Sequence, residues 1–212
     1  ACVVALATQT ITEPALLSAS VSKTDVLCNG ASTGAISITT PTGGVAPYEF
    51  SMNGEAYQSS GSFTGLAAGT YTLAIRDANA CVVALATQTI TEPTLLSASV
   101  SKTDVLCNGA STGAISITTP TGGVAPYEFS VNGGTYQSSG SFTGLAAGTF
   151  TLTIRDANAC VIALATQTIT EPALLSASVS KTDVLCNGAP TGTITITTPT
   201  GGVAPYEFSM NG

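Results

Sequence analysis

The sequence predicts an all-β protein made of tandem β-sandwich repeats. A repeat of 79 residues is marked by two series of cysteines with that spacing: Cys2, Cys81 and Cys160, and Cys28, Cys107 and Cys186. Residues 1–79 and 80–158 differ at only six positions. Short alternating segments rich in Thr, Val and Ile are separated by turn residues about every 8–12 positions, and no segment has helical periodicity. These three observations indicate small antiparallel domains that follow one another along the chain.

The first complete unit contains seven segments with the alternation of a strand. They are predicted at residues 17–21, 35–40, 48–52, 56–59, 62–66, 70–77 and 82–90. Leu17, Ala19 and Val21 alternate in the first of these segments. Asn53-Gly54 supplies the positive φ angles of a tight hairpin after the third. In the sixth segment, Tyr71, Leu73 and Ile75 are expected to point into the core.

Seven strands in this order predict an immunoglobulin or fibronectin type III-like sandwich. The stretch Gly65–Tyr71 resembles the corner between the fifth and sixth strands of that plan. Two Gly-rich loops, 29–34 and 43–47, neither open a helix nor contain the lysine of a phosphate-binding loop. We therefore assign them to turns.

The repeat length predicts four segments: residues 1–13 as the last strand of a preceding repeat, 14–92 and 93–171 as complete sandwiches, and 172–212 as the first strands of a following repeat. The chain is accordingly expected to belong to a longer array. The linker Ile90–Leu96 contains a proline and apolar residues instead of a flexible Gly/Ser run, so consecutive domains are expected to dock.

Composition excludes several functional classes. Hydrophobic residues make up 44% of the chain, which is too high for a disordered stalk. The net charge of −7 argues against a nucleic-acid partner. The longest apolar run, Ala1–Ala7, is too short to insert in a membrane. Histidine is absent and carboxylates are few, so no catalytic residues are predicted and the protein is not expected to be an enzyme.

Two cysteines per repeat predict a disulfide framework formed in an oxidising, extracellular location, with reduced core thiols as the alternative. Alternating strand directions place Cys28 at the end of its sandwich facing the next domain and Cys81 at the opposite end. We therefore expect an inter-domain Cys28–Cys160 bond, with Cys2, Cys81, Cys107 and Cys186 paired beyond the 212 residues. The alternative is pairing within repeats: Cys28 with Cys81, and Cys107 with Cys160.

No cofactor is predicted, apart from a calcium hypothesis. In the assumed plan, Asp25, Glu92 and Asp156 converge at a domain junction, and calcium prefers oxygen ligands. In the alternative, Asp77 and Asp156 simply close the turns in which they lie.

An ordered series of motifs spans the whole repeat: Cys28-Asn29-Gly30, Gly43–Tyr48, Gly65–Tyr71, Asp77–Cys81 and Ile90–Pro93. It resembles the SprB-type repeat of gliding-motility adhesins of the Bacteroidetes, except for Ala80, where that family usually has glycine. The resemblance implies very large surface proteins exported by type IX secretion, displayed as filaments, and without catalytic residues.

Two functions follow as hypotheses. The first is a structural or adhesive repeat of an extracellular, cell-surface filament, with neighbouring repeats of the same chain as partners and surface glycans or other cells as further ones. The second is a multivalent module that binds glycan or ice. Threonine rows such as 8-10-12 and 193-195-197 favour the second hypothesis, although Thr is also a common exposed strand residue. Tyr57 is the aromatic residue expected to form an exposed platform for sugars.

Overall fold

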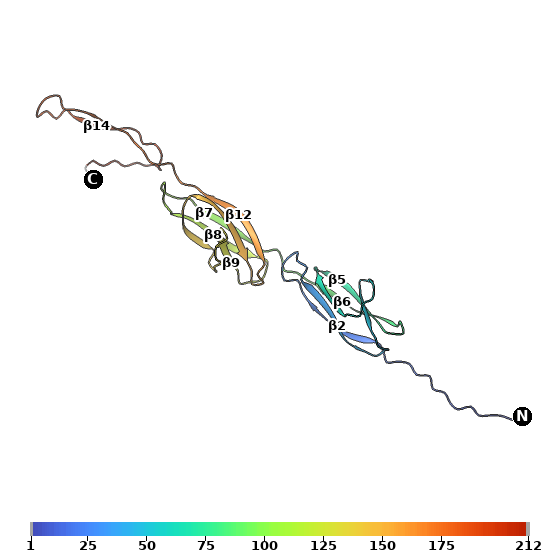
Figure 1. The fold of residues 1–212 in the computed structure, drawn as a ribbon. Helices are drawn as coiled ribbons and strands as arrows, with labels where there is room; N and C mark the ends of the chain where they lie inside the picture. Colours follow the sequence, from blue (N-terminus) through green and yellow to red (C-terminus); the bar gives the residue numbers. More distant parts are fainter. Residues whose placement is uncertain (1, 211–212) are drawn as a thin grey trace. The chain divides into compact units, whose positions relative to one another are not determined.

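The computed structural model describes residues 2–210, and in that range all regular secondary structure is β-strand. The chain divides into two compact units, Ala1–Thr94 and Leu95–Gly212. Each unit contains one complete sandwich (Figure 1).

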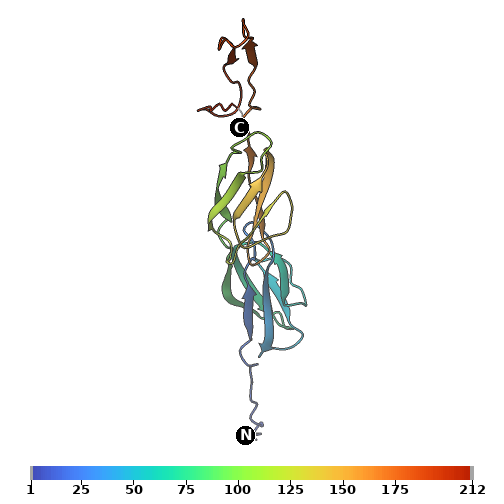
Figure 2. The same ribbon diagram turned by 90° about the vertical axis from the view of Figure 1, so that its left-hand side faces the viewer.

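The first repeat has six strands. They are β1 (Ser18–Thr24), β2 (Gly34–Thr42), β3 (Glu49–Met52), β4 (Ser62–Leu66), β5 (Gly69–Arg76) and β6 (Val82–Ile90). One antiparallel sheet has the order β1-β2-β4 and the other β3-β5-β6. This is the immunoglobulin-like arrangement, so the predicted fold class is confirmed. Figure 2 shows the sandwiches from the side.

The prediction of a strand at 56–59 is wrong. The segment is reduced to one antiparallel bridge between Phe50 and Gln58. The Gln58 side-chain amide donates to the carbonyl of Ser60, 2.7 Å away, which bends the chain directly after the bridge. The sandwich therefore has six strands plus a bridge.

The core lies between the two sheets and is made of the inward residues of both. Ile36 and Ile75 are fully buried at 0% exposure, and Leu73 is nearly so. Tyr71 is half-buried, and its hydroxyl donates to the carbonyl of Ala67 at 2.9 Å. This bond closes the corner between β4 and β5, in the manner of the tyrosine corner of immunoglobulin-like domains.

The second repeat reproduces the first. Its strands are β7 (Ser97–Thr103), β8 (Gly113–Thr121), β9 (Glu128–Val131), β10 (Ser141–Leu145), β11 (Gly148–Arg155) and β12 (Val161–Ile169). The sheets have the orders β10-β8-β7 and β12-β11-β9. Phe150 occupies the position that Tyr71 has in the first repeat. It packs against the core of the second repeat in the same way, but its side chain has no hydroxyl.

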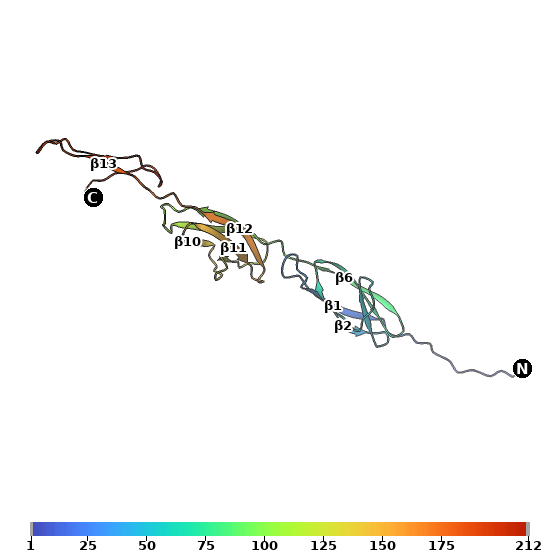
Figure 3. The same cartoon turned by 45° about the horizontal axis from the view of Figure 1, so that its top comes forward.

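The outer segments differ from the complete repeats. In the last copy, β13 (Val179–Thr182) and β14 (Thr193–Ile196) pair as a two-stranded ribbon (Figure 3). Residues 2–13 form no strand, and neither do Tyr206–Met210, which were predicted to form the third strand of that copy. Both segments lack the neighbouring strand with which their equivalents pair in a complete repeat. Ala1, Asn211 and Gly212 of these predicted segments lie outside the described residues.

Candidate functional site: the loop and linker that end each repeat

The loop after β1 is joined to the linker after β6. The Val26 amide donates to the carbonyl of Thr91 at 2.9 Å. One residue further along the linker, the Glu92 carboxylate accepts from the Gly30 amide at 2.6 Å and from Asn29 Nδ2 at 3.1 Å. Gly30 has a φ of +72°, a left-handed conformation that turns its N–H toward the carboxylate. Glu92 thereby holds the linker to its own repeat.

The second repeat has the same arrangement. The Gly109 amide donates to Glu171 Oε2 at 2.7 Å, and Asn108 Nδ2 donates to the carbonyl of Pro172 at 3.1 Å. Asn29 Nδ2 likewise reaches the carbonyl of Pro93. The pattern Asn-Gly in the loop and Glu-Pro in the linker therefore forms one recurring structural unit. In the sequence these two motifs are separate turn and linker elements, because nothing local joins them.

Asp25 lies beside this unit and fastens β1 to β6. It pairs with Lys23 at 2.8 Å and accepts from the Thr91 amide at 2.8 Å. The hydrogen bond from Lys23, followed by that from Thr91, lowers the pKa of Asp25 below its usual value. Asp104 has the equivalent contacts with Lys102 and Thr170, and its pKa is lowered for the same reasons.

Asp77 organises the opposite end of the repeat. It is buried, at 4% exposure, and its Oδ1 accepts from the amides of Asn79 and Cys81, each at 2.9 Å. Oδ2 accepts from the Val45 amide at 2.9 Å, which joins the turn before β6 to the Gly-rich loop before β3. Burial raises the pKa of Asp77, but these backbone donors outweigh it, and the pKa is lowered overall.

The equivalent Asp156 has the same donors, namely the amides of Val124, Asn158 and Cys160. Asp77 and Asp156 therefore each close the turn in which they lie, which was one of the two alternatives. Asp25, Glu92 and Asp156 each accept hydrogen bonds from their own repeats, and among residues 2–210 no group of three or more acidic, Cys or His side chains is placed to hold a metal. Calcium binding by these three stays a prediction, which an increase in melting temperature with calcium, reversed by excess chelator, would support.

The two cysteines of a repeat lie at opposite ends of β6. Cys28 is next to the Asn29-Gly30 loop at the Glu92 end, whereas Cys81 directly precedes β6 at its beginning. Nine strand residues span about 30 Å. A disulfide requires Cα atoms within about 4.4–6.8 Å. The geometry of the repeat therefore excludes the alternative pairing of Cys28 with Cys81, and by repetition that of Cys107 with Cys160.

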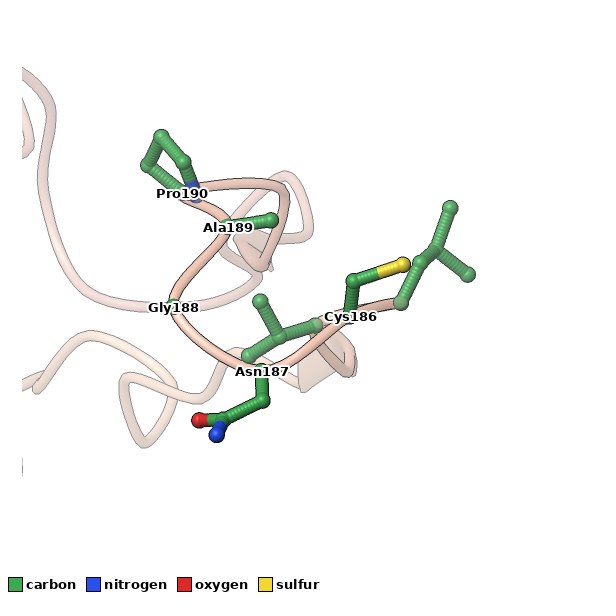
Figure 4. Close-up of a pocket in the computed structure, with 7 residues that line it drawn as sticks. Cys186, Asn187, Gly188, Ala189 and Pro190 are labelled. Carbon is green, nitrogen blue, oxygen red and sulfur yellow. The ribbon is translucent and has the colours of Figure 1, made fainter.

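Four cysteines are free and exposed in the described part of the chain: Cys2, Cys81, Cys107 and Cys186. Cys81 and Cys107 lie in complete repeats, so their exposure rules out the alternative of reduced core thiols for these two. Figure 4 shows Cys186 and Asn187 in the loop of the last copy, where both residues line a shallow surface hollow. The inter-domain pairing of Cys28 with Cys160 stays a prediction.

The expected aromatic platform, Tyr57, is covered on one face. Tyr57 is half-buried, and the guanidinium of Arg76 lies over its ring, 4.2 Å from the centroid. Glu49 holds Arg76 in place by accepting from its Nε at 3.1 Å and from its Nη2. One face of the ring is thus occupied by a cation–π contact and is not available for stacking on a sugar.

Threonine hydroxyls line the outer face of β5 and β6. Thr70, Thr72, Thr87 and Thr89 are all exposed, and the Oγ1 atoms of Thr70 and Thr89 are 3.3 Å apart. Thr149 and Thr168 form the same contact in the second repeat, at 3.2 Å. A small array of hydroxyls therefore recurs on each sandwich.

Surface hollows lie on the last copy, between residues 175 and 210. They open where that copy has one ribbon and no second sheet to cover it. Their lining contains no arrangement of nucleophile, base and oxyanion donors, so they give no reason to infer catalysis.

Comparison with known families decides the relationship. The family model described as the SprB repeat matches residues 20–56, 99–136 and 178–212, which together make up just over half of the chain. The chain belongs to the SprB repeat family. The three matches begin at corresponding positions of the three copies, and SprB repeat membership indicates a cell-surface repeat module. The resemblance drawn from the motifs is confirmed.

Among solved structures, the chain is similar to the C-terminal 282-residue fragment of intimin, whose structure was determined in complex with the intimin-binding domain of the translocated intimin receptor. The identity is 16%, the TM-score is 0.38, and the match covers 77% of this chain and 67% of that one. At this level the similarity carries no argument for function. A comparison with curated proteins finds no match. Within residues 2–210, no helix is long and apolar enough to cross a membrane.

Proposed function

We propose that this SprB repeat chain is a load-bearing and adhesive stretch of a long extracellular bacterial filament, displayed on the cell surface through type IX secretion and used in gliding or attachment. The observation that carries the proposal is the repeated fastening of each linker to the sandwich that precedes it. Glu92 and Glu171 make this contact with the same loop in successive repeats.

Such fastening reduces the freedom of the linker. Pro93 restricts φ, and the bonds from Val26, Asn29 and Gly30 hold residues 91–93 in one conformation. Fewer free backbone torsions between domains make a stiffer array. Stiffness suits a filament that must hold an adhesive surface away from the cell and transmit force.

The experiment is surface labelling and genetic removal in the bacterium that carries the gene. Antibodies raised against the 212-residue chain should label intact cells, and deletion of the gene should reduce attachment or gliding. Labelling that requires permeabilised cells would contradict the proposal. Surface labelling with unchanged attachment and gliding would contradict the adhesive part of it.

The second candidate function is multivalent binding of glycan or ice, and the hydroxyl array on β5 and β6 favours it. Weak binding at each repeat would be multiplied along the chain. A glycan array and an ice-recrystallisation assay test this function, with T70V/T89V/T149V/T168V as the variant. Binding that disappears in this variant would support the second function, and no binding by the native chain would count against it.

A further inference from the structure

We propose that cysteines staple consecutive repeats, so that each strand–linker–strand segment of the type Cys81–Cys107 becomes a taut covalent tether that bears load in place of the sandwich folds. The inference deepens the proposed filament function and rests on it for its biological purpose. The covalent arrangement itself is a property of the chain and is tested separately.

Cys28 lies at the end of the first repeat, beside the linker. Its neighbours Asn29 and Gly30 bond Glu92 and Pro93, where the chain leaves the first repeat. Within that repeat Cys81 is a strand length away, so Cys28 requires a partner outside its own sandwich.

The contacts of the preceding turn show where Cys160 lies in the second repeat. It follows the turn closed by Asp156, and the Ala157 amide of that turn donates to the carbonyl of Val124. A Cβ built on Gly123, the neighbour of Val124, would lie 2.7 Å from Asp156 Oδ2 and 3.3 Å from Leu96 Cδ1. Leu96 is where the chain enters the second repeat. Cys160 is therefore at the beginning of its sandwich.

A short linker joins the end of the first repeat to the beginning of the second. Only two residues separate Pro93, beside Cys28, from Leu96, beside the turn of Cys160. Both cysteines therefore border the same short linker. The same reasoning assigns Cys107 to the corresponding cysteine of a following repeat, and Cys81 to the loop cysteine of a preceding one, wherever such repeats adjoin.

Each staple is an oxidation of two thiols. The Sγ atoms of Cys28 and Cys160 form one S–S bond and release two protons and two electrons. A disulfide oxidant, either a small disulfide or a thiol–disulfide oxidoreductase outside the cytoplasm, accepts them and becomes two thiols.

The segment of chain between two staples consists mostly of strand residues. Cys81–Cys107 has 27 residues, of which β6 and β7 account for 16. At about 3.3 Å per strand residue, the fully extended segment measures about 90 Å. The strand residues of this segment are already extended, so slack can come only from the residues outside β6 and β7. In a longer array, staples and such segments alternate as a continuous covalent path, and β2–β5 lie outside it.

Peptide mapping tests the staple. In a C2S/C81S/C107S/C186S variant of the 212-residue chain, the substituted residues are free and exposed in the structure. With oxidised glutathione, this variant should form an intramolecular bond linking the tryptic peptides 24–76 and 156–181. A variant that stays reduced, or forms only intermolecular dimers, would overturn the proposal.

Single-molecule stretching tests the tether. A staple hides residues 29–159 from the applied force, and these 131 residues correspond to about 450 Å of contour at roughly 3.5 Å each. The oxidised chain should therefore extend about 450 Å less than its C28S control and lack the unfolding steps of the two sandwiches. Equal extensions of the two chains would refute the tether even if surface labelling succeeds. Failure of surface labelling alone would refute only the filament function.

Discussion

Replacing Glu92 with glutamine should loosen the linker without disturbing the sandwich. Glu92 Oε1 and Oε2 each accept one hydrogen bond, from Asn29 and Gly30. Glutamine keeps one acceptor and presents an N–H group to the other donor. Hydrogen bonds to charged groups contribute about 1.5–3 kcal/mol, and solvent screening at this exposed site reduces the expected loss to about 1 kcal/mol. A free-energy loss of 1 kcal/mol corresponds to about a fivefold increase in local opening.

Amide hydrogen exchange measured by NMR detects this change. The exchange rate of Gly30 should rise about fivefold in E92Q, while Gly109, which is held by Glu171, keeps its rate. E171Q should show the reverse, which also assigns the two glycine signals. E13Q is the matched control, because Glu13 has the same Thr-Glu-Pro context and precedes both loops. An unchanged Gly30 rate in E92Q, or an equal rise at both glycines, would refute the reasoning.

Three further predictions concern the sandwich itself. I90A should lower the free energy of unfolding by about 2–5 kcal/mol in urea denaturation, because Ile90 is 1% exposed and closes the core beside β2. A80G should raise it by about 0.5–1 kcal/mol, because Ala80 has a φ of +63° that glycine adopts without strain. D77N should lower the melting temperature at neutral pH. It should also make the melting temperature less dependent on pH in the acidic range. The pKa of Asp77 is lower in the folded state, so its stabilisation is present above about pH 4 and is lost as the pH falls through the folded pKa.

Each of these has its own control. V82A removes an exposed side chain, 54% accessible, from the same strand as Ile90 and should change stability by less than about 0.5 kcal/mol. A78G places the glycine elsewhere in the turn of Ala80 and should not stabilise the protein. For Asp77, the difference in melting temperature between native and D77N chains should shrink below pH 4. A constant difference from pH 3 to pH 6 would be inconsistent with the assigned hydrogen bonds.

Much of the fold was predictable because strand alternation is a local property. The predicted strands 62–66 and 82–90 coincide with β4 and β6, and Leu73 and Ile75 point inward as expected. The departure at Ala80 was also visible in the sequence, and its positive φ explains why glycine is favoured there. The role of Asp77 in its turn was one of two alternatives that the sequence left open.

The contacts of the candidate site were not predictable in this way. Glu92 and Gly30 are 62 residues apart, and so are Glu171 and Gly109. No local pattern relates such residues, because their meeting depends on how β1 and β6 are placed in the finished sandwich. The cover of Arg76 over one face of Tyr57, the residue expected to form an exposed platform for sugars, is similar.

The sequence by itself determined the 79-residue repeat, the strand segments and the family motifs, since each is encoded within a few neighbouring residues. Tertiary structure decided which of those segments become strands. Val3–Ile11 has the same nine residues as β6, and Glu207–Met210 the same four as β3, yet neither forms a strand. In the complete repeat both β3 and β6 bond to β5, and an isolated segment has no partner for its N–H and C=O groups.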